Sequence, residues 1–137
     1  MTHALFAYGT LMCADIFHAV SGQRLAGTPA TLAGFARHPV RGESYPAIAP
    51  APAAGVAGQL YRGLSAAALS RLDAFEGALY QRQRVTVVTP DDAPRTAWAY
   101  VIHPGQVARL ADGDWDFAHF VTTARASFLR QLIHRAG

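Results

Sequence analysis

Near its start the chain reads Phe6-Ala7-Tyr8-Gly9-Thr10-Leu11, an apolar run that ends in a glycine turn. The pattern predicts a strand over 4–9 and, after the turn, a short helix over 13–20. Glycine permits close backbone approaches, and successive N–H groups in such a turn can bind an anion. A glycine after a strand can equally be a plain turn residue, so both interpretations stay open here. The P-loop and the dinucleotide fingerprint are excluded, because their further glycines and the Gly-Lys-Ser/Thr sequence are missing.

A second informative segment, Leu72-Asp73-Ala74-Phe75-Glu76-Gly77, ends a predicted helix over 65–76. A serine suited to the N-cap precedes this helix, and a glycine follows it. At about 100° per residue, Glu76 projects between two leucines on the apolar side of the helix. A carboxylate there must be paired, hydrogen-bonded or protonated, and burial raises its pKa toward the range useful for proton transfer. The alternative is a structural acid at the last turn, which reaches solvent or pairs with Arg82 or Arg84.

Further apolar patterns fill the rest of the chain. They predict strands over 29–38, 55–62, 82–89 and 95–102, and a helix over 115–134. The proline- and alanine-rich residues 42–55 are too interrupted for regular structure and predict a loop that wraps the domain. This order of elements predicts an α+β fold, and a length of 137 residues suits a single compact domain over 1–137.

The composition excludes several classes of protein. A hydrophobic content of 51% with 15% charged residues excludes a disordered chain, and the longest apolar stretches are far shorter than the roughly 20 residues that span a bilayer. No secretory signal is visible and the single cysteine fits a reducing compartment, so we expect a cytoplasmic protein without a membrane partner. The net charge of +3 comes from scattered arginines without any lysine, so no nucleic-acid partner is expected.

The sequence also contains three weaker candidates for chemistry. Six histidines form neither an HExxH motif nor a close cluster of ligands, so no metal site is expected. Cys13 follows the glycine turn and could be a nucleophile near a helix N-terminus, although a buried inert thiol is the more frequent case. Glu43 and Glu76 could form a glycosidase-like pair, but nothing in the sequence brings them together, and Glu43 is expected to be solvated.

Five short motifs in a fixed order are more informative than any one of them. They are Tyr8-Gly9-Thr10-Leu11, Tyr45-Pro46-Ala47-Ile48, Gly58-Gln59-Leu60-Tyr61, Leu72-Asp73-Ala74-Phe75-Glu76-Gly77 with Tyr80 and Arg82 close behind, and Ala97-Trp98-Ala99-Tyr100-Val101. In this order and at these spacings they resemble the gamma-glutamylcyclotransferase-like family, which includes plant AIG2-like and gamma-glutamylamine cyclotransferase branches. The resemblance covers roughly residues 4–120. It implies a small mixed β-barrel, closed or partly closed, with flanking helices.

The resemblance also implies an enzyme that cyclises a gamma-glutamyl amine or peptide to 5-oxoproline and releases the amine. Glu76 would be its general acid and base. The substrate carboxylate would be held by backbone N–H groups of Tyr8, Gly9, Thr10 and Leu11. Tyr8 and Tyr100 would be wall or hydrogen-bonding residues, and Gly9 would allow a close approach to the ligand and a positive φ. No metal or organic cofactor is implied, and the partner is a small gamma-glutamyl substrate.

Two other functions would use the same pocket. A non-catalytic protein would bind a small amino-acid-derived metabolite without turnover. A hydrolase or acyltransferase would use Glu76 to activate water or an external amine. The glycine loop contains Thr10-Leu11, as in the shorter and functionally diverse branch of the family, so the leaving group stays open.

Overall fold

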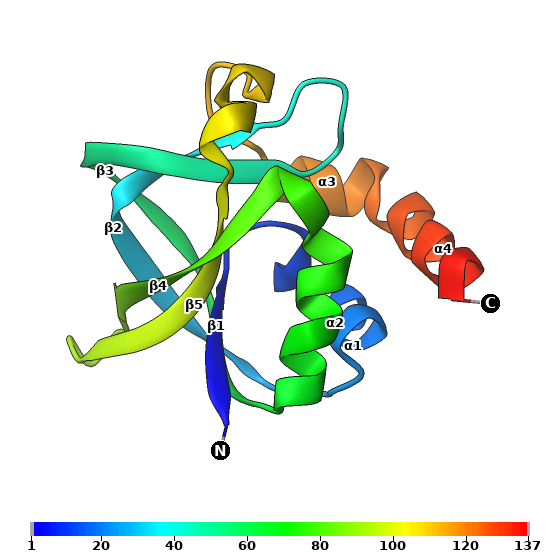
Figure 1. Ribbon diagram of the computed structural model, residues 1–137, viewed down its shortest axis with the longest axis horizontal. Coiled ribbons are helices and arrows are strands. Elements are labelled where there is room, and N and C mark those ends of the chain that lie inside the picture. The colour runs from blue at the N-terminus through cyan, green and yellow to red at the C-terminus, as the bar shows by residue number, and fades with distance from the viewer. Residues whose placement is uncertain (1, 137) are drawn as a thin grey trace.

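The computed structural model describes the backbone of residues 2–136 and, within that range, the side chains of residues 2–132. Its five strands are β1 (His3–Ala7), β2 (Gly27–Pro39), β3 (Pro46–Leu64), β4 (Tyr80–Val88) and β5 (Pro94–Ile102). They close a barrel in the order β1-β3-β2-β4-β5 (Figure 1). Most neighbours are antiparallel, whereas β1 and β3 each pair with β5 in parallel. The predicted mixed barrel with flanking helices is therefore confirmed.

The helices gather on one side of the barrel (Figure 1). They are α1 (Ala14–Ser21), α2 (Ala66–Glu76), α3 (Phe117–Thr123) and α4 (Arg125–Ala136), with short 3-10 turns η1 (Thr10–Met12), η2 (Gly77–Leu79) and η3 (Pro104–Arg109). Local sequence explains α2, because the Ser65 side chain accepts a hydrogen bond from the N–H of Ala68 and Gly77, at φ 68°, follows the last turn. Among the residues described, none of the helices has the length and apolar character needed to cross a membrane.

The side chains of β1 and the residue after it alternate between two apolar layers. Phe6 and Tyr8 belong to a cluster inside the barrel that draws side chains from all five strands. Leu5 and Ala7 belong to a second cluster, which lies between the barrel and the helices and includes Phe17 of α1. The end of β1 therefore lies where the end of the barrel meets the layer of helices.

The predicted loop over 42–55 is wrong, because β3 already begins at Pro46. Pro46 is the first residue of the strand, and Pro50 and Pro52 are tolerated because the ladder between β2 and β3 is interrupted beside them. Ala33 is opposite Gly55 and Phe35 is opposite Pro50, so four residues of β3 face a single residue of β2. A proline lacks the N–H that a regular ladder needs, and a bulge removes that need.

The predicted helix over 115–134 is two helices, separated at Ala124. Asp116 caps the first helix, because its side chain accepts a hydrogen bond from the N–H of His119 at 3.0 Å. The hydroxyl groups of Thr122 and Thr123 both donate to the carbonyl of His119, at 3.2 and 2.6 Å. Such back-bonding bends or ends helices, and it leaves α4 free to run in a new direction.

Candidate functional site

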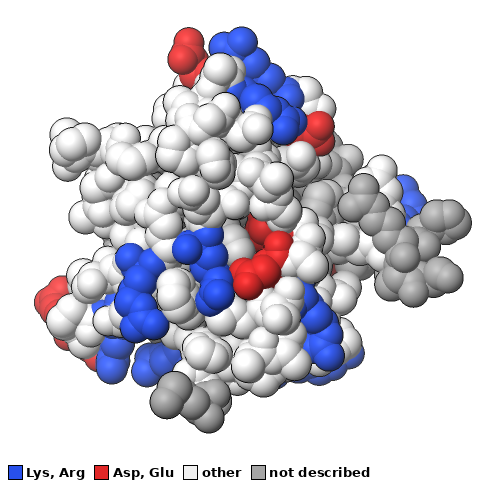
Figure 2. All heavy atoms as spheres, in the orientation of Figure 1, with Lys and Arg blue, Asp and Glu red and all other residues white. Residues whose placement is uncertain are grey.

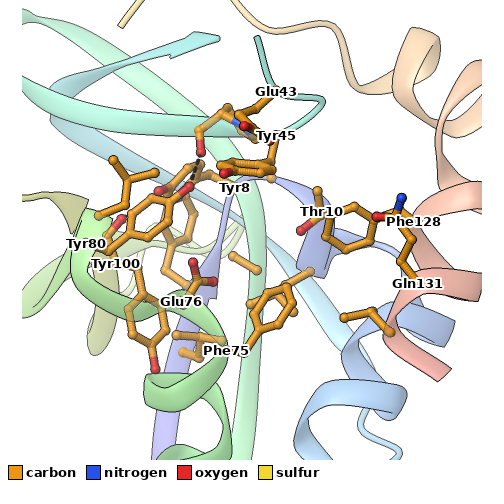
Figure 3. A pocket seen from close by; sticks show the side chains of 18 residues that line it. Tyr8, Thr10, Glu43, Tyr45, Phe75, Glu76, Tyr80, Tyr100, Phe128 and Gln131 are labelled. Carbon is orange, nitrogen blue, oxygen red and sulfur yellow. Dashed lines mark hydrogen bonds between the residues drawn. The ribbon is translucent and has the colours of Figure 1, made fainter. Parts of the chain in front are cut away.

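A cavity of about 370 Å³ opens where the end of the barrel meets the helices, a volume typical of small-ligand sites (Figure 3). It brings together the segment that follows β1, the start of β3, the last turn of α2 and one face of α4. The side chains that line it include Tyr8, Thr10, Glu43, Tyr45, Phe75, Glu76, Tyr80, Tyr100, Phe128 and Gln131. All the residues that the sequence proposed for catalysis and binding, namely Tyr8, Gly9, Thr10, Leu11, Glu76 and Tyr100, therefore line one cavity.

The carboxyl group of Glu76 lies in the middle of this cavity, between the tyrosines on one side and Thr10 and Phe128 on the other (Figure 3). Burial raises the pKa of Glu76 to about 8, because the charged form loses its hydration. The alternative pairing with Arg82 or Arg84 is wrong. Arg82 pairs with Asp73 at 3.0 Å, and the guanidinium groups of Arg82 and Arg84 lie over the ring of Trp98.

The turn after β1 brings its backbone to the cavity wall. The hydrogen bonds of η1 begin with the N–H of Met12, which donates to the carbonyl of Gly9 at 3.0 Å. The N–H groups of Gly9, Thr10 and Leu11 precede that first bond and have no partner inside the helical turn. They are the donors that this segment can offer to a ligand in the cavity.

A glycine is required at position 9 because the neighbouring atoms leave no room for a side chain. Its φ of −130° is negative, so the expected positive φ is wrong. A Cβ atom at this position would lie 2.8 Å from Cγ and 3.0 Å from Cδ of Pro46, well inside normal contact distance. Pro46 also lines the cavity, so any side chain at position 9 would push two of its walls apart.

The tyrosines around Glu76 are neutral hydrogen-bond donors held by fixed partners. The Tyr8 hydroxyl donates to the carbonyl of Tyr100 at 2.6 Å, and the Tyr100 hydroxyl donates to Oδ1 of Asp73 at 2.8 Å. Burial, and then the nearby charge of Glu76, raises the pKa of Tyr8 well above its usual range. Tyr100 therefore presents its ring to the cavity, whereas the Tyr8 oxygen keeps lone pairs that can accept a hydrogen bond.

Several cavity residues were not singled out as site residues from the sequence. Tyr45 lies within one of the five ordered motifs and Tyr80 closely follows another, and this position is the sequence signal that could have identified them. The Tyr80 hydroxyl also donates to the carbonyl of Pro46 at 2.7 Å. Phe128 belongs to an apolar stripe whose helical spacing is typical of core packing. Glu43 is exposed, as expected, and it lines the same cavity as Glu76, a proximity that nothing in the sequence indicated.

A second, more open cavity of about 290 Å³ reaches Glu76 from another side. It is lined by Asp73, Glu76, Gly77, Tyr80, Arg82 and Tyr100, three of which also line the first cavity. On the face drawn in Figure 2, acidic side chains lie in a hollow with basic side chains beside them. Glu76 therefore lines two cavities, an arrangement that suits a group exchanging protons.

The site can supply a carboxylate of high pKa, backbone N–H donors and neutral phenols. Within residues 2–132, no group of three or more histidine, cysteine or acidic side chains is placed to hold a metal ion. The charged side chains that line the larger cavity are Glu43 and Glu76, without an arginine or histidine among its described residues. This chemistry fits proton transfer and hydrogen bonding.

Cys13 is buried, with 7% of its surface exposed. Burial, and then the charge of Asp15, raises the pKa of its thiol to about 11, so the nucleophilic thiolate is scarce at neutral pH. Cys13 is also absent from the residues that line either cavity.

We therefore expect Cys13→Ser to change the turnover rate less than about twofold, because a serine hydroxyl replaces a thiol that does not react. Steady-state kinetics of the purified variant measures this. A folded Cys13→Ser protein without activity would mean that the thiol takes part in the chemistry.

Comparison with known proteins gives a consistent result. The sequence model of a family described as gamma-glutamyl cyclotransferase, AIG2-like, matches residues 5–117. AIG2-like protein D of Arabidopsis thaliana is 31% identical over 134 residues, which cover 93% of this chain and 85% of that protein. A solution structure of another A. thaliana protein covers 99% of this chain and 82% of its own, with a TM-score of 0.75 at 26% identity. A structure named gamma-glutamyl cyclotransferase has a TM-score of 0.66 over 96% of this chain and 86% of its own, and at 16% identity it shows a shared fold.

Proposed function

The chain belongs to the gamma-glutamyl cyclotransferase, AIG2-like family, and on that basis we propose that it cyclises gamma-glutamyl amides to 5-oxoproline and releases the amine. The observation that carries the proposal is the position of Glu76. Its carboxyl group has a pKa of about 8 and shares a cavity of ligand size with the N–H groups of the Tyr8–Leu11 turn. A general acid–base group works best when its pKa lies near the working pH.

The reaction needs little from the protein besides proton transfer and a fixed substrate conformation. The α-amino nitrogen of the substrate attacks its own γ-carbonyl carbon, a C–N bond forms in the five-membered ring, and the amide C–N bond breaks. Glu76 accepts the proton released by the attacking nitrogen and returns it to the leaving nitrogen. Well-oriented intramolecular reactions reach effective molarities on the order of 10⁵ M or more, so holding the folded substrate supplies much of the rate.

The shape of the cavity orients the substrate. The N–H groups of Gly9, Thr10 and Leu11 bind its α-carboxylate, which places the γ-amide near Glu76. The far wall is formed by α2 and α4, where the Phe75 and Phe128 rings meet edge to face at 6.1 Å between centroids. This apolar wall favours leaving amines without a carboxylate over leaving amino acids, because burying a second carboxylate is costly where the described lining residues include no cation.

The pKa of Glu76 predicts the pH dependence of the reaction. The base must be ionised to accept a proton, so kcat/KM should rise about tenfold per pH unit below 8, and about 50-fold between pH 6 and pH 8. Measurement of kcat/KM between pH 5.5 and 9.5 at constant ionic strength tests this. A plateau that already begins near pH 5 would show that Glu76 keeps an ordinary pKa or is not the base.

Incubation with gamma-glutamyl-n-butylamide, gamma-glutamyl-benzylamide and gamma-glutamyl-alanine, followed by mass detection of 5-oxoproline and glutamate, tests the activity itself. Release of 5-oxoproline above the rate without protein, and faster from the two amides of simple amines, supports the proposal. Release of glutamate would identify a hydrolase. Saturable binding without either product would identify a non-catalytic binding protein.

A further inference from the structure

Under the proposed function, the larger cavity binds the α-carboxylate of the substrate next to two acidic side chains. Its charged lining residues, Glu43 and Glu76, repel an anionic ligand when they are ionised. No arginine or histidine is found among the described residues that line it. Besides the polar side chains of Thr10, Tyr45 and Gln131, the N–H groups of the turn are therefore the donors that the described cavity wall offers to an anion, and whatever fixes and strengthens these N–H groups favours anion binding.

Arg37 of β2 stands directly behind this turn. Its Nη1 donates to the carbonyl oxygen of Tyr8 at 2.9 Å. Its Nε and Nη2 donate to the two carboxylate oxygens of Asp114 at 2.8 and 3.1 Å, and its guanidinium carbon lies 5.4 Å from the ring centroid of Trp115. The Arg37 side chain is only 16% exposed. Because a guanidinium is planar, the two bonds to Asp114 set the direction in which Nη1 points.

The carbonyl that Arg37 holds belongs to the same peptide unit as the N–H of Gly9. In a trans peptide the C=O and N–H bonds point in opposite directions, and the described part of the chain contains no cis peptide. With the Tyr8 carbonyl directed at Arg37, the Gly9 N–H is directed away from it. Gly9 lines the cavity and Arg37 does not, so an N–H directed away from Arg37 is directed toward the cavity.

We propose that Arg37 is a positioning residue for anion binding, which orients the Tyr8–Gly9 peptide so that the Gly9 N–H meets the α-carboxylate of the ligand. A hydrogen bond from a cation to the carbonyl also polarises the peptide and makes its N–H a stronger donor. The inference rests on the proposed function, because it assumes a ligand with the α-carboxylate of a gamma-glutamyl group. Asp114 has the supporting role of holding the guanidinium in place.

Two small ligands separate this effect from general damage to the cavity. 5-Oxoproline carries the carboxylate, and 2-pyrrolidinone is the same lactam ring without it. We expect Arg37→Met to weaken binding of 5-oxoproline about tenfold and to leave binding of 2-pyrrolidinone unchanged, as measured by NMR titration. For gamma-glutamyl-n-butylamide, KM should rise about tenfold while kcat changes less than about twofold, because the lost interaction is made equally in the ground and transition states.

Arg71→Met is a matched control, because Arg71 also donates to a backbone carbonyl, that of Ser21 at 3.0 Å, away from the cavity. Arg71→Met should leave the affinities for 5-oxoproline and 2-pyrrolidinone unchanged. If Arg37→Met does not fold, Asp114→Asn gives the second test, and it should weaken 5-oxoproline binding selectively but less strongly. Arg37→Lys keeps the charge without the planar fork and should rescue only part of the affinity.

The outcomes distinguish this inference from the proposed function. Equal loss of both ligands in Arg37→Met, or loss of neither, overturns the role of Arg37, while turnover by the wild-type protein still supports cyclisation. A wild-type protein that neither binds 5-oxoproline nor forms it overturns the proposed function, and the role of Arg37 with it.

Discussion

Replacement of Glu76 by glutamine is expected to lower kcat for 5-oxoproline formation by about 10²–10⁴-fold, the usual contribution of a general acid–base group. Glutamine has nearly the same shape, so the walls around it, including Phe75, should keep their positions. Its amide cannot accept the proton of the attacking amine at neutral pH. The loss should therefore appear in kcat, with the affinity for 5-oxoproline retained, as shown by steady-state kinetics and by ligand titration of the same preparation.

Glu43→Gln is the matched control, because Glu43 is the other carboxylate that lines the cavity and it is exposed. Its removal should leave kcat within about threefold of the wild-type value, since Glu43 is exposed to solvent and the proposed mechanism assigns the proton transfer to Glu76. If Glu76→Gln cyclises gamma-glutamyl amides at the wild-type rate, Glu76 is a structural acid and the proposed mechanism is wrong.

The Glu76→Gln protein should also show a changed dependence of stability on pH. The folded state raises the pKa of this carboxyl from 4.5 to about 8, so between these values the folded protein holds a proton that the unfolded chain has lost. The neutral carboxyl contributes fully to the free energy of unfolding below pH 4.5. This contribution is lost as the pH rises to 8, with a slope of up to about 1.4 kcal/mol per pH unit. Urea unfolding at pH 5 and pH 8.5 should therefore show a gain in relative stability for the variant at the higher pH.

Replacement of Gly9 by valine is expected to weaken binding of 5-oxoproline about 100-fold, because misplacing a binding group by about 1 Å has effects of that size. The new Cβ would lie 2.8 Å from Pro46, so the turn and the start of β3 must move apart. Overpacking of this kind costs about 1–3 kcal/mol of stability, which a domain of ordinary stability survives. NMR titration and thermal unfolding of the same variant measure the two effects.

Gly55→Val is a suitable control for this substitution. A Cβ at position 55 would make only an ordinary contact, 3.6 Å from the carbonyl oxygen of Leu32, and the residue is exposed in β3. Its binding constant should equal that of the wild-type protein. Normal binding by Gly9→Val would mean that the ligand carboxylate does not lie against this turn.

Local signals in the sequence were sufficient for the elements that carry the turn and Glu76. Ser65 caps α2 and a glycine ends it, and each effect depends on neighbours within four residues. The first half of β3 could not be found in this way. The prolines of this segment predict a loop instead of a strand. They are accommodated where four residues of β3 lie opposite Gly34 of β2. This interruption depends on the pairing with β2, so the local sequence of β3 does not reveal it.

The site shows the same division between local and long-range causes. A glycine at position 9 was anticipated, but the steric obstacle to a side chain there, Pro46, is distant in sequence and could not be. The close approach of this glycine to a ligand stays a prediction. Phe128 was interpreted as core, and it does pack on Phe120 with 5.7 Å between ring centroids. Its place in the cavity wall depends on the break at Ala124, which helical periodicity does not reveal.

The parallel pairing of β1 with β5 has a consequence for the order in which the molecule is assembled. β1 precedes the other described strands in the sequence, yet it pairs with β3 on one side, where Ala4 meets Arg62, and with β5 on the other, where Leu5 meets Trp98. Pairing over such separations is slow, because the intervening chain must close first. The Tyr8–Leu11 turn continues β1 and therefore takes its final shape late. The cavity is complete only when α4, which follows the other described helices in the sequence, has packed against it.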